Sequence, residues 1–424
     1  MRTKLKNTFS SLKIRNYKLY FIGQAISLSG TWIQTIAQDW LVLQITHSGT
    51  QLGIVSAFQF LPILILGPWG GVIADRFSKR KILFFTQTIF GILALILGTL
   101  VLTHSIQIYM IYILALALGL VNVINSPTLQ TFVPEMVGKE NLQNAVSLNT
   151  TEVNLARAVG PALAGILILF VGIGWCFIIN AISYIAVIVA FYMMREKELQ
   201  PATRVQKKSG QLMEGLRYVR SNPLLLNTLI MMAIIGTLSY EFSIILPLIA
   251  QYTFHGNAGS YASLVAATGI GAVVGGLFAA GRKKVSPNML VMSAMGFGIS
   301  LTIAALMPSI FLMILVMFVA GIFSINFISL GNITLQTESK PEMRGRVMAL
   351  WAVAFLGSTP IGGPIIGWIG QNIGPRYGLA VGGVAAIIAA VIGKIKIARK
   401  NETYLVSSEE KILEEQTDKQ MSLK

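Results

Sequence analysis

The sequence GGVIADRFSKRK, residues 70 to 81, gathers five charged side chains directly after a pair of glycines. Apolar segments with almost no charge flank it at 52–74 and 82–103. Segments of roughly 20 residues are long enough, as helices, to cross a ~30 Å hydrocarbon layer. The charged stretch is therefore predicted to be a short loop that joins two membrane-spanning helices.

The composition of the whole chain extends this interpretation. Of 424 residues, 54% are hydrophobic and 12% are charged, and this charged share is about half that of an ordinary soluble domain. The fold class is therefore predicted to be an all-α polytopic membrane protein. Twelve transmembrane helices are expected at 17–45, 50–74, 82–103, 106–131, 143–170, 173–195, 223–251, 258–281, 288–307, 310–336, 344–372 and 376–398.

The positions of the basic residues predict the orientation of the chain. The net charge is +16, and lysine and arginine gather in the N-terminal arm, at 76–81, at 195–220 and near the C-terminus. The loops on the opposite side carry His47, His104 and His255 and almost no full charge. This positive-inside pattern predicts a multi-pass protein of the cytoplasmic (inner) cell membrane with both termini in the cytoplasm. Nucleic-acid binding is not expected, because no groove-reading motif accompanies the charge.

Motifs for catalysis and metal binding are missing from the sequence. Cys176 is the single cysteine, so an internal disulfide is excluded and no Cys/His cluster suggests a metal site. No nucleophile-and-base set, no paired metal acids and no Gly-x-x-x-x-Gly-Lys-Ser/Thr loop occur. The chain is expected to be neither an enzyme nor an ATPase, and to need no cofactor.

An internal repeat divides the chain into two halves around a long polar segment at 196–222. Thr128-Leu-Gln-Thr131 and Pro134-Glu-Met136 return, 206 to 207 residues later, as Thr334-Leu-Gln-Thr337 and Pro341-Glu-Met343. The predicted domains are an N-terminal six-helix bundle (1–195), a central cytoplasmic loop (196–222), a C-terminal six-helix bundle (223–400) and a cytoplasmic tail (401–424) that is expected to be disordered. Matching halves of this kind place a site between them near the middle of the membrane.

Two motifs can be matched to a known family. Gly71-Val-Ile-Ala-Asp75-Arg76-Phe-Ser-Lys79-Arg80-Lys81 resembles the loop signature G-x-x-x-D-R-x-G-R-R/K of the major facilitator superfamily, with Ser78 in place of the second glycine. Ala156-Arg157-Ala-Val-Gly160-Pro161-Ala-Leu-Ala-Gly165 is similar to the antiporter motif G-P-x-x-G-G of exporters in that superfamily. Together with Asn154, these motifs look most like the twelve-helix drug and siderophore exporters, which include macrolide efflux proteins and enterobactin exporters.

The resemblance implies two pseudo-symmetric six-helix bundles and secondary active transport by a monomer. The expected function is proton-coupled export of a small amphipathic or lipophilic compound, such as a drug, a macrolide or a siderophore-like molecule, by alternating access. The proton and the lipid bilayer are the other expected partners. The alternatives are an importer, a sodium-coupled facilitator and, less in keeping with the repeat, a membrane receptor. Helix 106–131 has no arginine, although many proton-coupled facilitators carry one there, so coupling is not expected to use that residue.

The first predicted helix carries a polar stripe. At 100° per residue, its polar side chains fall within an arc of about 140°, and lipid would not face such a stripe because unpaired polar groups in hydrocarbon are costly. We expect the stripe to line a wet cavity, with burial against polar neighbours as the alternative. Asparagines of later helices are candidates for the same cavity or for hydrogen bonds between helices. The cavity candidates are Gln24, Ser27, Thr31, Gln34, Gln38, Asn122, Asn125, Asn154 and Asn326.

Four ionisable residues in the apolar segments, Asp39, Glu241, Glu152 and Arg157, are candidates for proton or substrate coupling. Asp39 and Glu241 occupy equivalent places in the two halves, and we expect them to bind a proton or a cationic substrate group; headgroup water at a helix end is the alternative. Burial disfavours a charged carboxylate and a nearby cation favours it, so such a group can exchange protons. Glu152 and Arg157 project about 140° apart on one helix. Arg157 is expected to meet an acid or the substrate, or to form a structural bond between helices.

The charged loop and the Gly-Pro pairs are candidate gates. On the cytoplasmic side, Asp75 is expected to meet the positive helix end at 341–344, and the neighbouring arginines to pair with acids such as Glu135 or Glu342. This latch would bridge the halves in the outward-open state; a surface ion pair is the alternative. On the outer side, proline and glycine are expected to kink helices, or to serve as static packing sites. The gate candidates are Gly71, Asp75, Arg76, Lys79 and Arg80 inside and Gly160, Pro161, Gly165, Gly363 and Pro364 outside.

Overall fold

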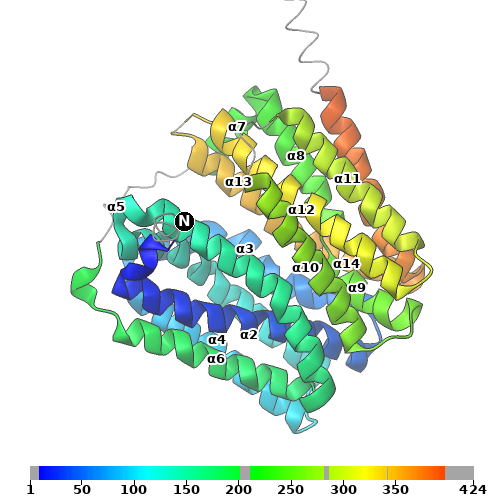
Figure 1. Ribbon diagram of the computed structural model, residues 1–424, viewed down its shortest axis with the longest axis horizontal. Coiled ribbons are helices and arrows are strands. Elements are labelled where there is room, and N and C mark those ends of the chain that lie inside the picture. Colours follow the sequence, from blue (N-terminus) through cyan, green and yellow to red (C-terminus); the bar gives the residue numbers. More distant parts are fainter. Residues whose placement is uncertain (1–8, 201–210, 281–285, 341, 397–424) are drawn as a thin grey trace, which may run out of the picture.

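The computed structural model describes residues 9–200, 211–280, 286–340 and 342–396, and these residues form helices and short connections without a β-strand among them. Figure 1 shows two groups of helices that lie against each other, one from each half of the sequence. The predicted tail at 401–424 lies outside the described residues.

The first group contains the helices of the N-terminal half. They are α2 (Arg15–Thr46), α3 (Gly49–Arg76), α4 (Lys79–Leu102), α5 (Ile108–Val171) and α6 (Ile173–Met193), preceded by the short 3-10 helix η1 (Ser10–Lys13). The 64-residue α5 contains two spans, because Gly138 adopts a left-handed φ of 68° that breaks the helix between them. A non-helical connection between two spans was expected at 132–142. These residues are helical apart from Gly138, so this expectation is wrong.

The second group contains the C-terminal half. Its elements are α7 (Gln211–Ser221), α8 (Pro223–Leu238), α9 (Phe242–Leu248), the π-helix η3 (Ile249–Thr253), α10 (Ala258–Ala280), α11 (Pro287–Leu306), α12 (Ile310–Glu338), α13 (Arg344–Leu356), α14 (Thr359–Asn372) and a last helix, Pro375–Lys396. Two helices that were expected to be continuous are interrupted. Residues 239–241 separate α8 from α9, and residues 357–358 separate α13 from α14.

The helices have the dimensions of a membrane protein. Eleven segments of the described chain are long and apolar enough to cross a membrane. The remaining predicted span is α2, whose 32 residues include the polar stripe and which contacts α5 and α6. With α2 as the twelfth helix, the predicted all-α fold of two six-helix bundles is confirmed.

The internal repeat is visible in equivalent hydrogen bonds of the two halves. In α5, the Thr131 hydroxyl donates to the carbonyls three and four residues before it, at 3.1 and 2.9 Å. In α12, the Thr337 hydroxyl does the same at 3.4 and 2.9 Å. These bonds satisfy a polar side chain inside an apolar segment by using the carbonyls of its own helix. The repeated sequence therefore has a repeated local structure.

Polar residues cap the helices that follow tight connections. The hydroxyls of Ser48, Ser286 and Ser309 accept backbone N–H groups at the starts of α3, α11 and α12. The Asn222 side chain does this for α8, whose first residue is Pro223. Both arrangements satisfy or remove N–H groups that have no partner in the first helical turn.

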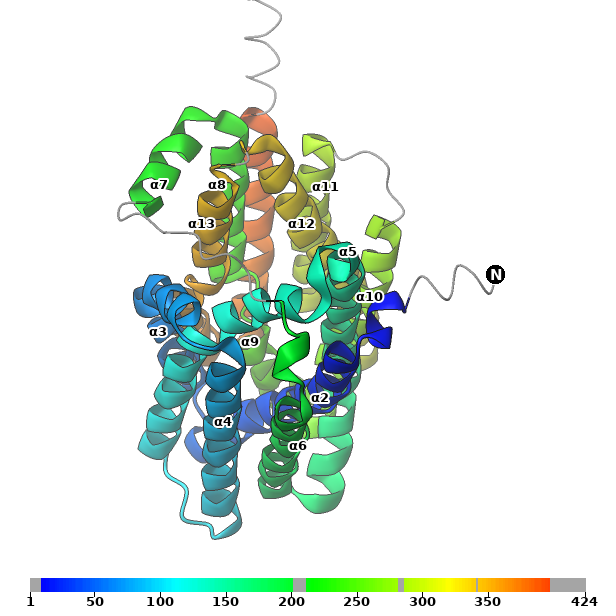
Figure 2. The ribbon, with the colours of Figure 1, turned by 90° about the vertical axis from the view of Figure 1, so that its left-hand side faces the viewer.

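The two groups converge at one end and diverge at the other, as Figure 1 shows. Figure 2 faces the diverging end, with α7, α8 and α11 of the second group above α3, α4 and α6 of the first. At the converging end, which we name the closed end, the start of α3 lies against α14. A Cβ atom on Gly53 would lie 2.4 Å from the Gly363 carbonyl oxygen, and one on Gly367 would lie 2.2 Å from that of Gly49. The two backbones therefore meet more closely than any side chain would permit.

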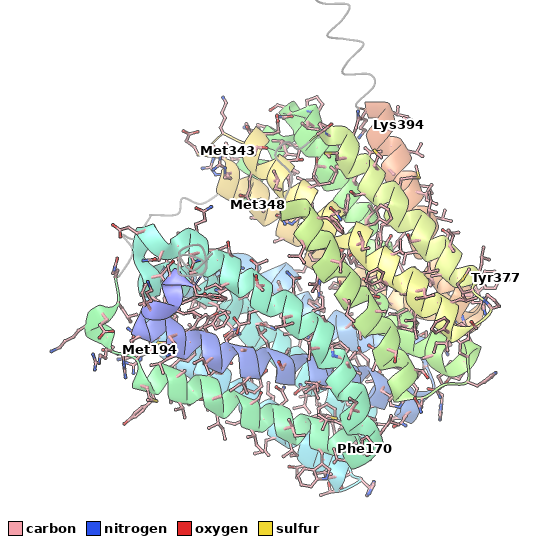
Figure 3. All side chains as sticks on the ribbon, in the orientation of Figure 1. Phe170, Met194, Met343, Met348, Tyr377 and Lys394 are labelled. Carbon is pink, nitrogen blue, oxygen red and sulfur yellow. The ribbon has the colours of Figure 1, made fainter. Side chains whose placement is uncertain are left out.

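At the diverging end, which we name the open end, polar contacts run within one half. Figure 3 places Met194 and Met343 at this end, on separate groups. The Asn16 amide at the start of α2 donates to the Arg195 carbonyl at 2.9 Å, and its oxygen accepts the Arg195 N–H at 3.0 Å. This buried pair of hydrogen bonds ties the beginning of α2 to the end of α6.

Candidate functional site

A cavity of about 620 Å³ lies between the two halves. Helices α2 to α6 supply one part of its wall, and α9, α10, α12, α13 and α14 supply the other. This volume is in the range of sites that enclose small organic molecules. Polar side chains and aromatic rings are mixed in the lining, as a compound with both polar and apolar parts requires.

The polar stripe of α2 lines this cavity. Asn180 of α6 donates to Gln34 Oε1 at 2.7 Å, and the Tyr184 hydroxyl lies 3.4 Å from Thr31 Oγ1. Some members of the stripe therefore face the cavity and also bond a polar neighbour. The members that line the cavity are Gln24, Ser27, Thr31, Gln34, Thr35, Gln38 and Asp39.

Two of the predicted asparagines, Asn122 and Asn125, also line the cavity. Asn125 Oδ1 accepts hydrogen bonds from Thr86 Oγ1 at 2.9 Å and from Gln87 Nε2 at 3.2 Å. The Oε1 atoms of Gln87 and Gln24 are buried without a hydrogen-bond partner among the described residues. An unsatisfied buried acceptor costs about 1–3 kcal/mol.

Asp39 connects the two halves within the cavity wall. Its carboxylate accepts a hydrogen bond from the Tyr261 hydroxyl of α10 at 2.7 Å, and the Trp40 ring stacks on the Tyr261 ring at 6.5 Å. Asp39 is only 7% exposed, which places it in the protein interior. Among the described residues, no lysine or arginine pairs with it. A neutral hydroxyl leaves the charge of this carboxyl group uncompensated.

Glu241 lies at the break between α8 and α9, where the backbone leaves the helical conformation. Its side chain lines the cavity and is 5% exposed, and its Oε1 has no hydrogen-bond partner in the part of the chain that the structure describes. Gly362 of α14 makes room for it, since a Cβ atom there would lie 3.1 Å from Glu241 Oε1. Asp39 lies on an unbroken helix, so the two acids differ in their backbone setting.

Tyr240, at the same break, lines the cavity although the sequence pattern did not single it out. Its hydroxyl donates to the Ser324 carbonyl of α12 at 2.9 Å, and its ring lies edge-on to Phe355 of α13 at 5.3 Å. Interrupted spanning helices are a common feature of transport sites. The polar run 239–241 inside an apolar segment was the available signal for this break.

Arg157 lines the cavity from α5 and rests on an aromatic ring. Its guanidinium carbon lies 5.4 Å from the centre of the Trp32 ring of α2. Contacts of this kind contribute about 0.5–2 kcal/mol. Among the described acids, none forms an ion pair with Arg157. Trp32 gave no signal in the sequence because an aromatic residue in an apolar helix is ordinary.

Three predicted site residues do not line the cavity: the coupling candidate Glu152 and the cavity candidates Asn154 and Asn326. Glu152 is buried elsewhere, because it projects about 140° from Arg157 around α5, and its Oε1 has no partner among the described residues. The Asn154 amide donates to the carbonyl four residues before it, at 2.8 Å. The Asn326 amide does the same at 2.7 Å and reaches a carbonyl of α10 at 3.5 Å. Backbone carbonyls thus accept the N–H groups of both amides away from the cavity, whereas Asn326 Oδ1 is buried without a partner among the described residues.

The charged residues at 76–81 lie at the open end, and their ion pairs stay within one half. Lys79 pairs with Glu135 of α5. Arg80 pairs with Glu196 at 2.6 Å. The expected pairing of Arg80 with Glu135 or Glu342 is therefore not formed, because Lys79 already holds Glu135 and the second half diverges at this end.

The other candidates for the cytoplasmic gate form no described bridge between the halves. The side chain of Asp75 and all of Pro341 lie outside the described residues, and Arg76 is exposed. Gly71 is half-buried in α3, whereas a Cβ atom on Gly70 would lie 1.9 Å from a backbone carbonyl oxygen of α5 in the same half. The latch between the halves stays a prediction for the outward-open state.

The outer-gate candidates of α5 are close-packing positions. A Cβ atom on Gly160 would lie 2.4 Å from Trp32 Cβ of α2, and one on Gly165 would lie 2.8 Å from Ala262 Cβ of α10. The backbone angles stay helical through Pro161. Gly165 therefore brings α5 close to the other half without a break in the helix.

The candidates of α14, Gly363 and Pro364, lie where this helix meets the start of α3. A polar contact continues the same interface. Gln371 Oε1 accepts hydrogen bonds from Ser48 Oγ at 2.6 Å, from Thr50 Oγ1 at 2.9 Å and from the Thr50 N–H at 3.2 Å. Neutral hydrogen bonds thus hold the closed end together.

Replacing Gln371 with alanine should loosen the closed end. A net hydrogen bond contributes about 0.5–1.5 kcal/mol, and losing these exposed ones should shift the equilibrium toward opening about 5- to 30-fold, or 1–2 kcal/mol. Distances between spin labels on α3 and α14 would measure the shift. Asn372→Ala is the control, because its amide bonds only a carbonyl of its own helix, at 2.9 Å. Equal shifts in both variants would contradict the assignment.

Comparison with known proteins agrees with this architecture. A family model described as transmembrane secretion effector matches residues 6–422. The chain belongs to the transmembrane secretion effector family. The match covers both groups of helices and the cavity between them, so the whole described fold belongs to this family.

Relatives of this transmembrane secretion effector are transporters. It is 25% identical to the staphyloferrin A transporter of Staphylococcus aureus over 383 residues, which cover 88% of this chain and 94% of that protein. It is 24% identical to the enterobactin exporter EntS of Citrobacter koseri over 382 residues, which cover 89% and 90%. The expected membership in an exporter branch of the major facilitators is confirmed, and the chain is a secondary transporter.

Solved structures share the fold of this secretion effector. The nucleoside transporter NupG matches with a TM-score of 0.72 at 14% identity, over 91% of this chain and 99% of that one. A bacterial homolog of the human lysosomal transporter Spinster, in an inward-facing and occupied conformation, matches with a TM-score of 0.70 at 14% identity, over 91% and 97%. These likenesses establish the major facilitator fold.

Proposed function

We propose that this chain exports a small amphipathic compound of the siderophore-like kind across the cytoplasmic membrane, by proton-coupled alternating access. The observation that carries the proposal is a cavity between two halves that is lined by polar and ionisable side chains and closed at one end by backbone contacts. Relatives named for staphyloferrin A and enterobactin support the substrate class. The proposal assigns the chain no enzymatic reaction.

The charges at the two ends support a cytoplasmic position for the open end. Arg15, Lys79, Arg80 and Arg346 lie at the starts of helices there. On the closed side, the turn between α2 and α3 at His47 and Ser48 carries no lysine or arginine. Because basic residues favour the cytoplasmic side, we infer an inward-facing conformation with both termini in the cytoplasm of the inner membrane.

Asp39 and Glu241 are proposed to carry the coupling proton. Both carboxyl groups line the cavity and are almost fully buried, and neither pairs with a lysine or arginine among the described residues. A carboxyl group in such a setting changes its protonation with its surroundings. If the substrate and the proton bind in the same cavity, binding of one can exclude binding of the other. Exchange of substrate for protons requires this mutual exclusion.

Residues 1–195 and 223–400 are proposed to be the two moving bodies of a monomer, joined by 196–222. The polar ties at the open end support this division because they run within a half. Asn16 and Arg195 exchange two hydrogen bonds within the first body, and Arg346 of the second body pairs with Glu214 of the joining segment at 2.6 Å. Such ties persist while the two bodies rotate against each other around the central cavity.

Transport into everted membrane vesicles tests the proposal. Vesicles with and without the protein would receive labelled enterobactin, staphyloferrin A, macrolides and dyes, together with an imposed proton gradient. We expect the protein to accumulate at least one siderophore, and a protonophore to collapse the accumulation because the driving force is the proton gradient.

Different outcomes separate the alternatives. Accumulation that survives the protonophore but needs a sodium gradient would replace the proton with sodium. Accumulation only in right-side-out vesicles would indicate an importer. Binding without counterflow of labelled substrate in liposomes would indicate a receptor and contradict transport altogether.

A further inference from the structure

The charged groups of the cavity differ in their partners. Among the described lining residues, three carry a formal charge: Asp39, Glu241 and Arg157. Asp39 accepts the hydroxyl of Tyr261 at 2.7 Å. Arg157 forms no ion pair and donates no side-chain hydrogen bond to any described residue, and its recorded contact is the Trp32 ring at 5.4 Å. The cation of the cavity is therefore available to a ligand.

The contact with Trp32 leaves the donors of Arg157 free. An aromatic ring attracts a guanidinium through its π-face and does not use up the N–H groups. The guanidinium has five N–H donors in one plane, and two of them match the two oxygens of a carboxylate. An unpaired charge in a spanning helix is costly and commonly functional. Trp32 thus holds Arg157 in place while its N–H groups remain unpaired.

We infer that Arg157 binds a carboxylate of the transported compound. This inference rests on the proposed function and deepens it, because it makes the substrate an organic acid. The amide side chains of Gln24 and Gln87 line the same cavity and supply polar partners for hydroxyl groups of the compound. The rings of Tyr240 and Phe355 offer an apolar wall for the rest of the molecule. The substrate class is therefore a hydroxylated carboxylic acid with an apolar part.

Binding of matched acids and esters to the purified full-length chain tests this inference. The probes are citrate with trimethyl citrate, and gallate with methyl gallate, measured by isothermal titration calorimetry in detergent. We expect the wild type to bind the acids and not the esters. Arg157→Gln should weaken acid binding about 10- to 100-fold, as expected for charged hydrogen bonds. Arg157→Lys should lose less, because it keeps the charge but not the paired donors.

Arg376→Gln is the matched control. Arg376 also lies over an aromatic ring, that of Phe254 at 5.5 Å, but it donates to the Ala305 carbonyl at 2.9 Å and does not line the cavity. Acid binding should be unchanged in this variant. Thermal melting of all variants would show that they fold.

Four results of the binding and export measurements would overturn the inference, and a fifth would come from transport by the Arg157 variants. They are equal affinity for acids and esters, equal losses in Arg157→Gln and Arg376→Gln, no binding of either acid to the wild type at millimolar concentration, and export of a compound without an acidic group. Alternatively, Arg157 could pair with Asp39 in another conformation. The Arg157 variants would then lose transport but bind the acids as the wild type does, and this result would also contradict the inference. Acid binding without accumulation in vesicles would contradict the proposed export and leave the carboxylate site in place.

Discussion

Asp39→Asn is expected to lower proton-driven accumulation in everted vesicles strongly and to leave substrate exchange in place. Asparagine keeps a side-chain oxygen that can accept the Tyr261 hydroxyl, which bonds Asp39 at 2.7 Å in the wild type, but it cannot take up or release a proton. Accumulation should fall about 5- to 150-fold, the range of ordinary coupling free energies between two sites. Counterflow, which needs no proton gradient, should change far less.

Glu196→Gln is the control for the loss of a carboxylate. Glu196 is 61% exposed at the open end, where it pairs with Arg80, and exposed ion pairs contribute about 0–1 kcal/mol. Substrate accumulation by the Glu196→Gln variant should remain near the wild-type level. Glu241→Gln should behave as Asp39→Asn does, since both acids line the cavity. Unchanged accumulation in both cavity variants would remove these acids from the coupling mechanism.

Gly367→Leu is expected to prevent the closed end from forming, and with it transport. A Cβ atom at this position would lie 2.2 Å from the Gly49 carbonyl oxygen, so any side chain must push α14 away from α3. The variant should mainly populate conformations in which α3 and α14 are separated and this end is open. Cross-linking between cysteines placed by Thr50→Cys and Gln371→Cys should be lost, and counterflow should fall to background.

Gly67→Ala is the matched control in α3. A Cβ atom there meets nothing within 4 Å, so the closed end and its cross-link should be preserved. Loss of the cross-link in both variants would show that glycine substitutions in these helices act through general destabilisation. A Gly367→Leu protein that transports at the wild-type rate would refute the role of this contact.

The fold and one wall of the cavity were predictable from the sequence. Side chains on a rigid helix share a direction at fixed spacing, and hydrocarbon excludes a polar stripe from the lipid side. Every member of the stripe from Gln24 to Asp39 lines the cavity for this reason. The repeat likewise predicted that Glu241 has the place in the second half that Asp39 has in the first, and both line the cavity.

The parts that were not predictable depend on contacts between distant segments. The break at 239–241 is held by Tyr240, whose partners Ser324 and Phe355 come from later helices. Periodicity also cannot tell whether an amide faces a cavity or bonds its own backbone, and Asn154 and Asn326 do the latter. A sequence pattern shows which side chains share one face of a helix, but it does not show which residues or which cavity that face contacts.

The first turn of α4 carries three basic residues, Lys79, Arg80 and Lys81, at the N-terminal end, where the helix dipole is positive. Lys79 and Arg80 are countered there by Glu135 and Glu196, whereas the opposite end of the molecule relies on the uncharged Gln371. Dissolved ions screen exposed charges beyond about 8–10 Å and leave neutral hydrogen bonds alone. Higher ionic strength therefore weakens the exposed Arg80–Glu196 pair at the open end, whereas the largely buried Lys79–Glu135 pair and the neutral hydrogen bonds of Gln371 at the closed end are affected much less.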